Sequence, residues 1–442
     1  MSAISRWTLW SLSGCILIVL ALVQCTEQAA SLGERQLRPL SLSALAALVG
    51  SPDPIKNIDP SNPRSHLSHI LIPRPPDTAN NTLVRTYIIS TLRALNWHIE
   101  EDSFVDTTPY GPKNFTNVIA TKDPSAPRRV ALAAHFDSKF FEKSPENQFL
   151  GATDSAAPCA LMLDLAEALN PLLDARAKRL ADAEGTFNPD ADEDEDEALH
   201  TTLQLIFFDG EEAFKDWTDT DSIYGARHLA DKWSSTFLPP HPKRRLLPYS
   251  SPPTALSTLE HLVLLDLLGA SAPRIRSFFP DTGWLFDMLV RAEDRLRAEG
   301  LLDPAGAGAA EAWRSFFVPR TGKEASMGYV GDDHVPFLRR GVSVLHVIAE
   351  PFPRVWHTLA DDASALDLPT LRRWNLLLRV FFCEYLGLQP DVGAGAKRDA
   401  HARLREAPHP HRGEEPPTSS TPPESERVTG AQPNVRRSDS EL

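Results

Sequence analysis

The chain has 442 residues, of which 42% are hydrophobic, and its formal net charge is −14 at pH 7. This length allows either one large α/β domain with appendages or two ordinary domains, and the apolar content is enough for a core. The negative charge argues against nucleic acid or an anionic membrane as the main partner. Much of it comes from the run "DADEDEDE" at 190–197, so the folded body is closer to neutral.

The N-terminus has the pattern of a targeting segment. Arg6 precedes the apolar stretch "WTLWSLSGCILIVLALVQC", which small and polar residues follow. We expect residues 1–30 to be a cleaved signal peptide, with an uncleaved signal anchor as the alternative. The sequons at Asn80 and Asn114 favour the secretory pathway. The protein is then secreted, or held in the Golgi membrane if the segment stays attached.

Helical and strand patterns alternate along the body of the chain. After short helical patterns at 34–72, a helix is predicted to lead into a strand within 82–104. Further strands are predicted at 117–121, 129–137, 201–209, 259–269 and 342–348. Further helices are predicted at 155–173, 224–233, 284–300 and 369–388. The strands are almost wholly apolar, which predicts an α/β fold with a central mixed, mostly parallel sheet flanked by helices on both faces.

Two segments differ in composition from this body. Residues 176–200 have the character of an acidic surface insertion. Residues 390–442 are rich in Pro, Ser and charge and are predicted to be a disordered tail. The catalytic domain is therefore expected at 34–389.

Polar residues follow the apolar runs where a site is expected to form, because ligands of open α/β sheets bind beyond the carboxyl ends of the strands. These residues are His135 and Asp137, Asp154, Asp209, Glu211 and Glu212, Asp266, Asp332 to His334, and Trp356 with His357. Singly, each has an ordinary structural explanation, such as a helix N-cap for Asp154. Together they suit zinc, and a metal would offset the adjacent acids Glu211 and Glu212.

Two other classes of protein are less well supported by the sequence. A nucleophilic hydrolase is disfavoured because no GxSxG motif is present and nothing marks Ser155 or Cys159 as activated. A binding or structural module would not explain why acids and histidines converge at strand ends. Cys159 and Cys383 lack metal-binding spacing, and either free thiols or a bridge between them is possible.

Several motifs resemble those of the glutaminyl-peptide cyclotransferases, relatives of the zinc aminopeptidases. The matching stretches include "AHFDSK", "GATDSAAPCALMLDLA", "LQLIFFDGEEAF", "DDHVPFLRRGVSVLHVI" and "PFPRVWHT". They occur in order between about residues 80 and 388. The resemblance implies three zinc ligands (Asp154, Glu212 and His357), an acid/base (Glu211) with supporting acids (Asp266 and Asp332), and a side-chain pocket (Trp217, Phe352 and Trp356).

The implied reaction converts the N-terminal Gln of peptides and proteins, and more slowly Glu, to pyroglutamate with release of ammonia. One zinc ion per chain and a monomer are expected. Where animal members carry a cysteine that pairs with the counterpart of Cys159, this chain has Ala134, so Cys159 should be free. Gly331 replaces a larger polar residue beside the pocket.

A secreted two-zinc aminopeptidase is the main alternative. His135, Asp154, Glu212, Asp266 and His357 could hold two metals, with Glu211 as the base. The ligand inventory does not separate the two enzymes. We favour the cyclotransferase because Trp356, Trp217 and the "PFP" turn fit a pocket for a side chain at the metal. A non-catalytic zinc-binding relative is disfavoured by the intact Glu211.

Overall fold

The computed structural model describes residues 34–50, 52–182, 197–241, 253–302, 314–324 and 328–390. The predicted N-terminal targeting segment, the tail after 390 and most of the acidic insertion lie outside these ranges. Within the insertion, residues 176–182 continue a long helix, and Arg176 is buried.

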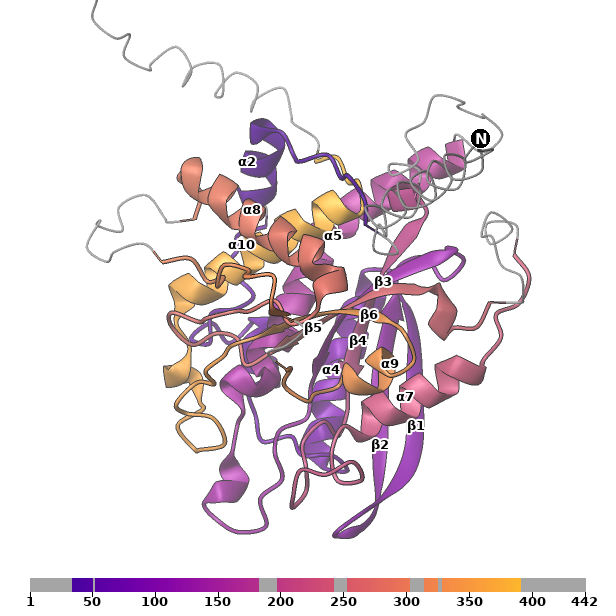
Figure 1. Cartoon of the computed structure of the whole chain (residues 1–442). Helices are drawn as coiled ribbons and strands as arrows, with labels where there is room; N and C mark the ends of the chain where they lie inside the picture. Colours follow the sequence, from indigo (N-terminus) through magenta and orange to yellow (C-terminus); the bar gives the residue numbers. More distant parts are fainter. Residues whose placement is uncertain are drawn as a thin grey trace, which may run out of the picture. The chain divides into compact units, whose positions relative to one another are not determined.

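A six-stranded mixed sheet forms the centre of the domain, with the order β1-β2-β4-β3-β5-β6 (Figure 1). Its strands are β1 (His98–Thr108), β2 (Gly111–Thr121), β3 (Arg128–His135), β4 (Thr201–Phe208), β5 (Leu259–Asp266) and β6 (Ser343–Ile348). β1, β2 and β4 pair antiparallel, whereas β4, β3, β5 and β6 run parallel. The predicted fold class is confirmed.

The helices cover the sheet on both faces (Figure 1). They are α2 (Leu42–Gly50), α3 (His66–Ile70), α4 (Ala79–Ala94), α5 (Ala157–Asp182), α7 (Tyr224–Ser235), α8 (Gly283–Ala298), α9 (Val335–Leu338) and α10 (Leu368–Tyr385). α4 and α5 pack against the sheet, and α10 packs on α5, while α7 covers β1 and β2 beside α9. Short helical turns lie at Glu146–Gln148, Ala152–Ala156, Leu256–Thr258, Pro280–Thr282 and Ala363–Ala365.

Burial explains the apolar strand patterns. Every residue of β4 is buried because neighbouring strands flank it and helices cover the sheet. β2 begins six residues before the predicted 117–121, since its first half pairs with β1 in a hairpin whose side chains are partly exposed and polar. Hydropathy alone does not reveal such a half-exposed ribbon.

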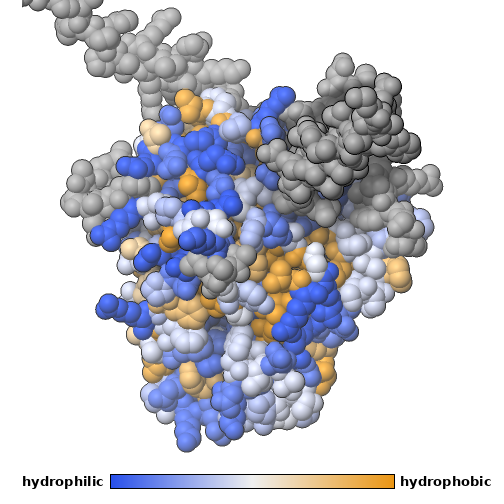
Figure 2. Space-filling model, viewed as in Figure 1, coloured by the Kyte–Doolittle hydropathy of each residue, from blue (hydrophilic) through white to orange (hydrophobic). Residues whose placement is uncertain are grey.

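The surface is mostly polar on the face drawn in Figure 2, with one compact apolar area near its middle. The segment Glu146–Asp182 includes a stretch as long and apolar as a membrane span, but 78% of that stretch is buried within the protein. Its apolar side chains therefore belong to the core.

Candidate metal and catalytic site

The parallel strands deliver polar side chains to one edge of the sheet. His135 is the last residue of β3, Asp266 is the last residue of β5, and Asp209 follows β4 directly. β3 and β4 stay in register to their ends, where His135 lies opposite Phe208. The loops after these strands carry the other candidate residues.

Asp154, Glu212 and His357 form a group that we call the open triad. Their potential ligand atoms all lie within 4.8 Å of one another, although the residues come from three separate loops. His357 Nε2 is 3.2 Å from Glu212 Oε1 and 3.4 Å from Asp154 Oδ2. The His357 side chain is 22% exposed, whereas the two carboxylates are almost fully buried. Solvent, and hence a substrate, can reach this group at His357.

The open triad fits a metal such as zinc. One nitrogen and two carboxylate donors match the ligands that zinc takes in catalytic sites. Glu212 Oε1 is buried and accepts no hydrogen bond from the described residues. Its nearest positive group is the His357 ring at 3.2 Å, and a metal cation held by the open triad would satisfy the buried oxygen.

The charges of the open triad are strongly coupled. Burial would raise the pKa of Asp154, but His135 and His357 outweigh it and hold that pKa below its usual range. Burial would lower the pKa of His357, but Asp154 and Glu212 raise it to about 9. A proton on His357 therefore takes the place that a metal cation would otherwise fill.

Glu211 is adjacent to this triad in sequence but has a different environment. Burial raises its pKa well above the ordinary value, and Glu212, Asp332 and Asp333 raise it further against the opposing effect of His135. Asp137 accepts hydrogen bonds from the backbone amides of both Glu211 (3.2 Å) and Glu212 (3.4 Å). One carboxylate after β4 thus joins the triad, while burial and neighbouring acids raise the pKa of the other.

The supporting acids lie near Glu211 without bonding to its carboxylate. Asp266 accepts a hydrogen bond from the Ser155 hydroxyl and from the amide of Leu267. Asp332 instead bonds His346. Asp332 acts on Glu211 through its charge, which helps to raise the pKa of Glu211.

His135 lies among three carboxylates. Its Nε2 is 3.0 Å from Asp154 Oδ1 and 3.5 Å from Asp266 Oδ1, and its Nδ1 is 3.4 Å from Asp137 Oδ1. Burial opposes its protonation, but these three acids raise its pKa well above the usual value. His135, Asp154 and Asp266 also have metal-compatible spacing. The side chains that could bind a second metal are thus present, and in the described structure the His135 ring pairs with the carboxylates of this group.

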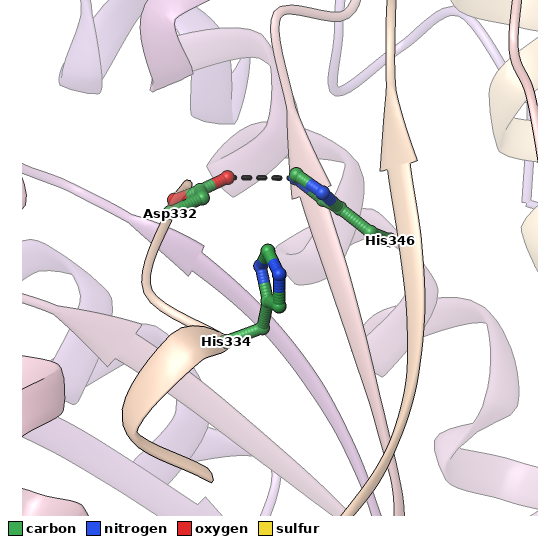
Figure 3. A group of neighbouring side chains, drawn as sticks. All are labelled: Asp332, His334 and His346. Atoms are coloured by element: carbon green, nitrogen blue, oxygen red, sulfur yellow. Dashed lines mark hydrogen bonds and ion pairs between the residues drawn. The ribbon is translucent and has the colours of Figure 1, made fainter. Parts of the chain in front are cut away.

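Asp332, His334 and His346 form a second group, which we call the buried cluster (Figure 3). Asp332 and His334 precede α9, and His346 belongs to β6. His346 Nε2 is 2.8 Å from Asp332 Oδ2, and the rings of His334 and His346 lie 4.4 Å apart. Neither nitrogen of His334 has a hydrogen-bond partner among the described residues. Burial and the neighbouring His346 lower the pKa of His334 to about 3, so its ring is neutral.

The three predicted pocket aromatics lie in two places. Trp356 stacks on His357 with 3.8 Å between ring centroids, and Phe352 packs edge-on against Trp356 at 5.0 Å. Trp217 is 49% exposed and lies beside Gly331, where an added Cβ would be 3.9 Å from its Nε1. The rings of Trp356 and Phe352 therefore lie next to the open triad, and the ring of Trp217 lies beside Gly331, which precedes Asp332.

Sequence reasoning assigned no role to some residues that contact the site. Lys139 lies 3.3 Å from Glu212 Oε2, and the motif "AHFDSK" that contains it could have pointed to it. Ser155 supports Asp266, although it follows Asp154 directly in the sequence. Cys159 and Cys383 are both free and buried, which confirms the free thiol expected at Cys159.

Comparison with known proteins gives a consistent family. Residues 117–382 match Peptidase family M28. A glutaminyl-peptide cyclotransferase-like protein of Mus musculus is 43% identical over 351 residues, which cover 79% of this chain and 80% of the relative. A glutaminyl-peptide cyclotransferase of Bos taurus is 42% identical over 330 residues, covering 74% and 82%. The crystal structure of Macrostomum lignano glutaminyl cyclase aligns with a TM-score of 0.64 and 36% identity, covering 81% of this chain and 97% of that one.

Proposed function

Because the chain belongs to the glutaminyl-peptide cyclotransferases of peptidase family M28, we propose that it cyclises the N-terminal Gln of peptides and proteins to pyroglutamate. The γ-acyl group passes from the side-chain nitrogen to the α-amine, and ammonia leaves. This is an intramolecular aminoacyl transfer. N-terminal Glu is a slower substrate because its carboxylate resists attack.

In this proposal the open triad holds one zinc ion through Asp154, Glu212 and His357. A metal held by these residues would supply Lewis-acid chemistry to the γ-carboxamide carbonyl of the substrate. Trp356 and Phe352 hold the glutamine side chain against apolar ring surface next to His357. Trp217 covers the other side of the pocket, beside Gly331.

Glu211 moves the protons of the reaction. It accepts one from the α-amine as the new nitrogen–carbon bond forms, and it returns one to the side-chain nitrogen as the old bond breaks. A carboxyl with a raised pKa suits both steps, because an acid/base works best when its pKa is near the working pH. Asp332 and Asp333 help to keep it raised, and Asp137 fixes its backbone. The observation that carries the proposal is that Glu212 lies in the open triad, whereas its neighbour Glu211 has a raised pKa.

The two-zinc aminopeptidase is the weaker candidate. It would need His135 and Asp266 as ligands of a second metal. In the structure His135 lies within 3.0 to 3.5 Å of Asp154, Asp137 and Asp266, and the Ser155 hydroxyl donates a hydrogen bond to Asp266. We therefore assign one zinc ion per chain.

The remaining assignments extend beyond the described residues. We propose that residues 34–389 form the catalytic domain, that residues 1–30 direct the chain into the secretory pathway, and that the enzyme is a glycosylated monomer. Asn80 lies on the exposed N-terminal turn of α4, where a glycan would be tolerated. Cleavage of the targeting segment gives a secreted enzyme, and retention gives a membrane-anchored one.

Mass spectrometry of a Gln-initiated peptide incubated with the zinc-loaded protein tests the activity. Loss of ammonia from an otherwise intact peptide is the expected result. Release of the whole first residue would instead identify an aminopeptidase. A peptide that begins with Ala is the matched control, because only the aminopeptidase would change it.

A further inference from the structure

The four residues that precede Asp154 are held from two sides by groups outside the open triad. On one side lies Arg74, whose side chain is completely buried. Its guanidinium donates hydrogen bonds to the carbonyl oxygens of Leu150 and Gly151 and, through Nε, to that of Phe136. Arg74 thus ties the segment before Asp154 to the residue that follows His135.

On the other side lies Asp361, which is also completely buried. Its Oδ1 accepts a hydrogen bond from the amide of Thr153 at 2.8 Å, and its backbone oxygen accepts one from the amide of Ala152 at 3.0 Å. Asp361 belongs to the loop that carries His357, since its own amide bonds the Thr358 carbonyl at 3.0 Å. Two candidate metal ligands from distant parts of the chain are joined through this one residue.

The segment between these two anchors folds back tightly. Gly151 has a φ of +56°, and a Cβ at this position would lie 2.1 Å from the carbonyl oxygen of Asp154. Only glycine fits there. The approach to Asp154 is therefore a close turn whose carbonyl groups face Arg74 and whose amides face Asp361.

The charges of Arg74 and Asp361 also favour the close turn at 150–153. Arg74 forms no ion pair within 4.0 Å among the described residues and bonds only to uncharged oxygens there. Burial lowers its pKa, and the negative charges of Asp137, Asp154 and Asp361 oppose that effect. The negative charges of these carboxylates thus balance the buried Arg74 cation, although none of them forms a direct ion pair with it.

We propose that Arg74 and Asp361 are positioning residues that clamp the turn at 150–153 and thereby set Asp154 and His357 at the spacing a metal requires. The inference rests on the proposed zinc site. Neither residue is one of the ligands or the acid/base, so both act through the groups they hold. Residues that orient metal ligands commonly contribute about 10–100-fold to metal affinity.

The test is zinc affinity, measured by competition with a chromogenic chelator, together with the unfolding temperature of the metal-free protein. We expect Asp361→Ala to weaken zinc binding by about 10–100-fold. Its metal-free unfolding temperature should fall by less than about 4 °C, because one hydrogen bond is lost in a large domain. Asp361→Asn should restore most of the affinity, since its amide oxygen can accept the same bond from Thr153.

Asp362→Ala is the matched control. Asp362 is a partly exposed neighbour whose carboxylate also accepts a backbone bond, but from Ser364 in its own loop. It should bind zinc like the wild type. If Asp361→Ala also binds zinc like the wild type, or if Asp361→Asn is as weak as Asp361→Ala, the clamp is refuted.

Arg74→Lys keeps the inference testable if Asp361→Ala does not fold. Lysine retains the charge but lacks the fork that reaches two carbonyl groups. We expect a similar loss of zinc affinity, and wild-type affinity in this variant would also refute the clamp. Failure of the wild type itself to bind zinc would refute the zinc site, which is a different result.

Discussion

The open triad and the buried cluster contain similar metal-binding side chains but differ in access. In the open triad His357 reaches solvent, and Glu212 has a buried oxygen without a hydrogen bond. In the buried cluster His346 and Asp332 bond each other, and both side chains are at most 3% exposed. Donor type and spacing alone do not identify a catalytic metal site. A substrate must also reach it, and its charges must need a cation.

His357→Ala should have the largest effect on this contrast. It removes one of three ligands of the open triad, so zinc affinity should fall by more than the roughly 10–100-fold that loss of a supporting residue costs. Cyclisation should be lost with the metal. Zinc content after dialysis and turnover of a Gln peptide measure both. Full zinc occupancy in this variant would mean that the metal binds elsewhere, with the buried cluster as the next candidate.

Glu211→Gln should separate binding from chemistry within the open site. The variant keeps all three ligands and should retain zinc, whereas kcat should fall about 10²–10⁴-fold because the proton carrier is lost. Glu212→Gln is the matched control, since it alters a ligand in the neighbouring position and should lose zinc as well. Unchanged turnover of Glu211→Gln would remove its acid/base assignment.

Zinc affinity should also depend on pH in a way that the open triad predicts. Zinc needs the neutral imidazole, and the pKa of His357 is raised to about 9 in the metal-free fold. Below that pH a proton competes, so affinity should fall by up to about tenfold for each pH unit. Chelator competition between about pH 7 and pH 9 measures the slope. A flat profile would show that His357 does not titrate with metal binding.

His334→Gln should give the smallest effect and should act on stability alone. The pKa of His334 is about 3 in the folded chain, below its unfolded value near 6.5, so the unfolded state binds the extra proton between these values. Folding stability therefore falls as pH drops through this window, by up to about 1.4 kcal/mol per pH unit. The variant should lose this part of the slope in denaturant unfolding. Reduced zinc content in His334→Gln would contradict this contrast, because it would connect the buried cluster to metal binding.

Local patterns in the sequence were sufficient for the fold class. The uninterrupted apolar run 203–208 can be satisfied only by a strand covered on both faces, and alternation with amphipathic helices then implies a sheet with helices on both sides. The same patterns placed Glu211 and Glu212 at a strand end, because the change from apolar to charged residues is abrupt. The half-exposed start of β2 escaped this reasoning, since its polar side chains in the hairpin with β1 do not form an apolar run.

By itself, then, the sequence determined the elements, their polar ends and, through long specific motifs, the family. Only the tertiary structure decided which acids and histidines meet. It joined Asp332 to His346, placed His135 among three carboxylates, and linked the loops of Asp154 and His357 through Asp361. The physical reason is the distance along the chain over which each property is set. Helix and strand periodicity are set by neighbouring residues, whereas pKa values and ligand spacing depend on burial and on charges that the fold brings together from distant segments.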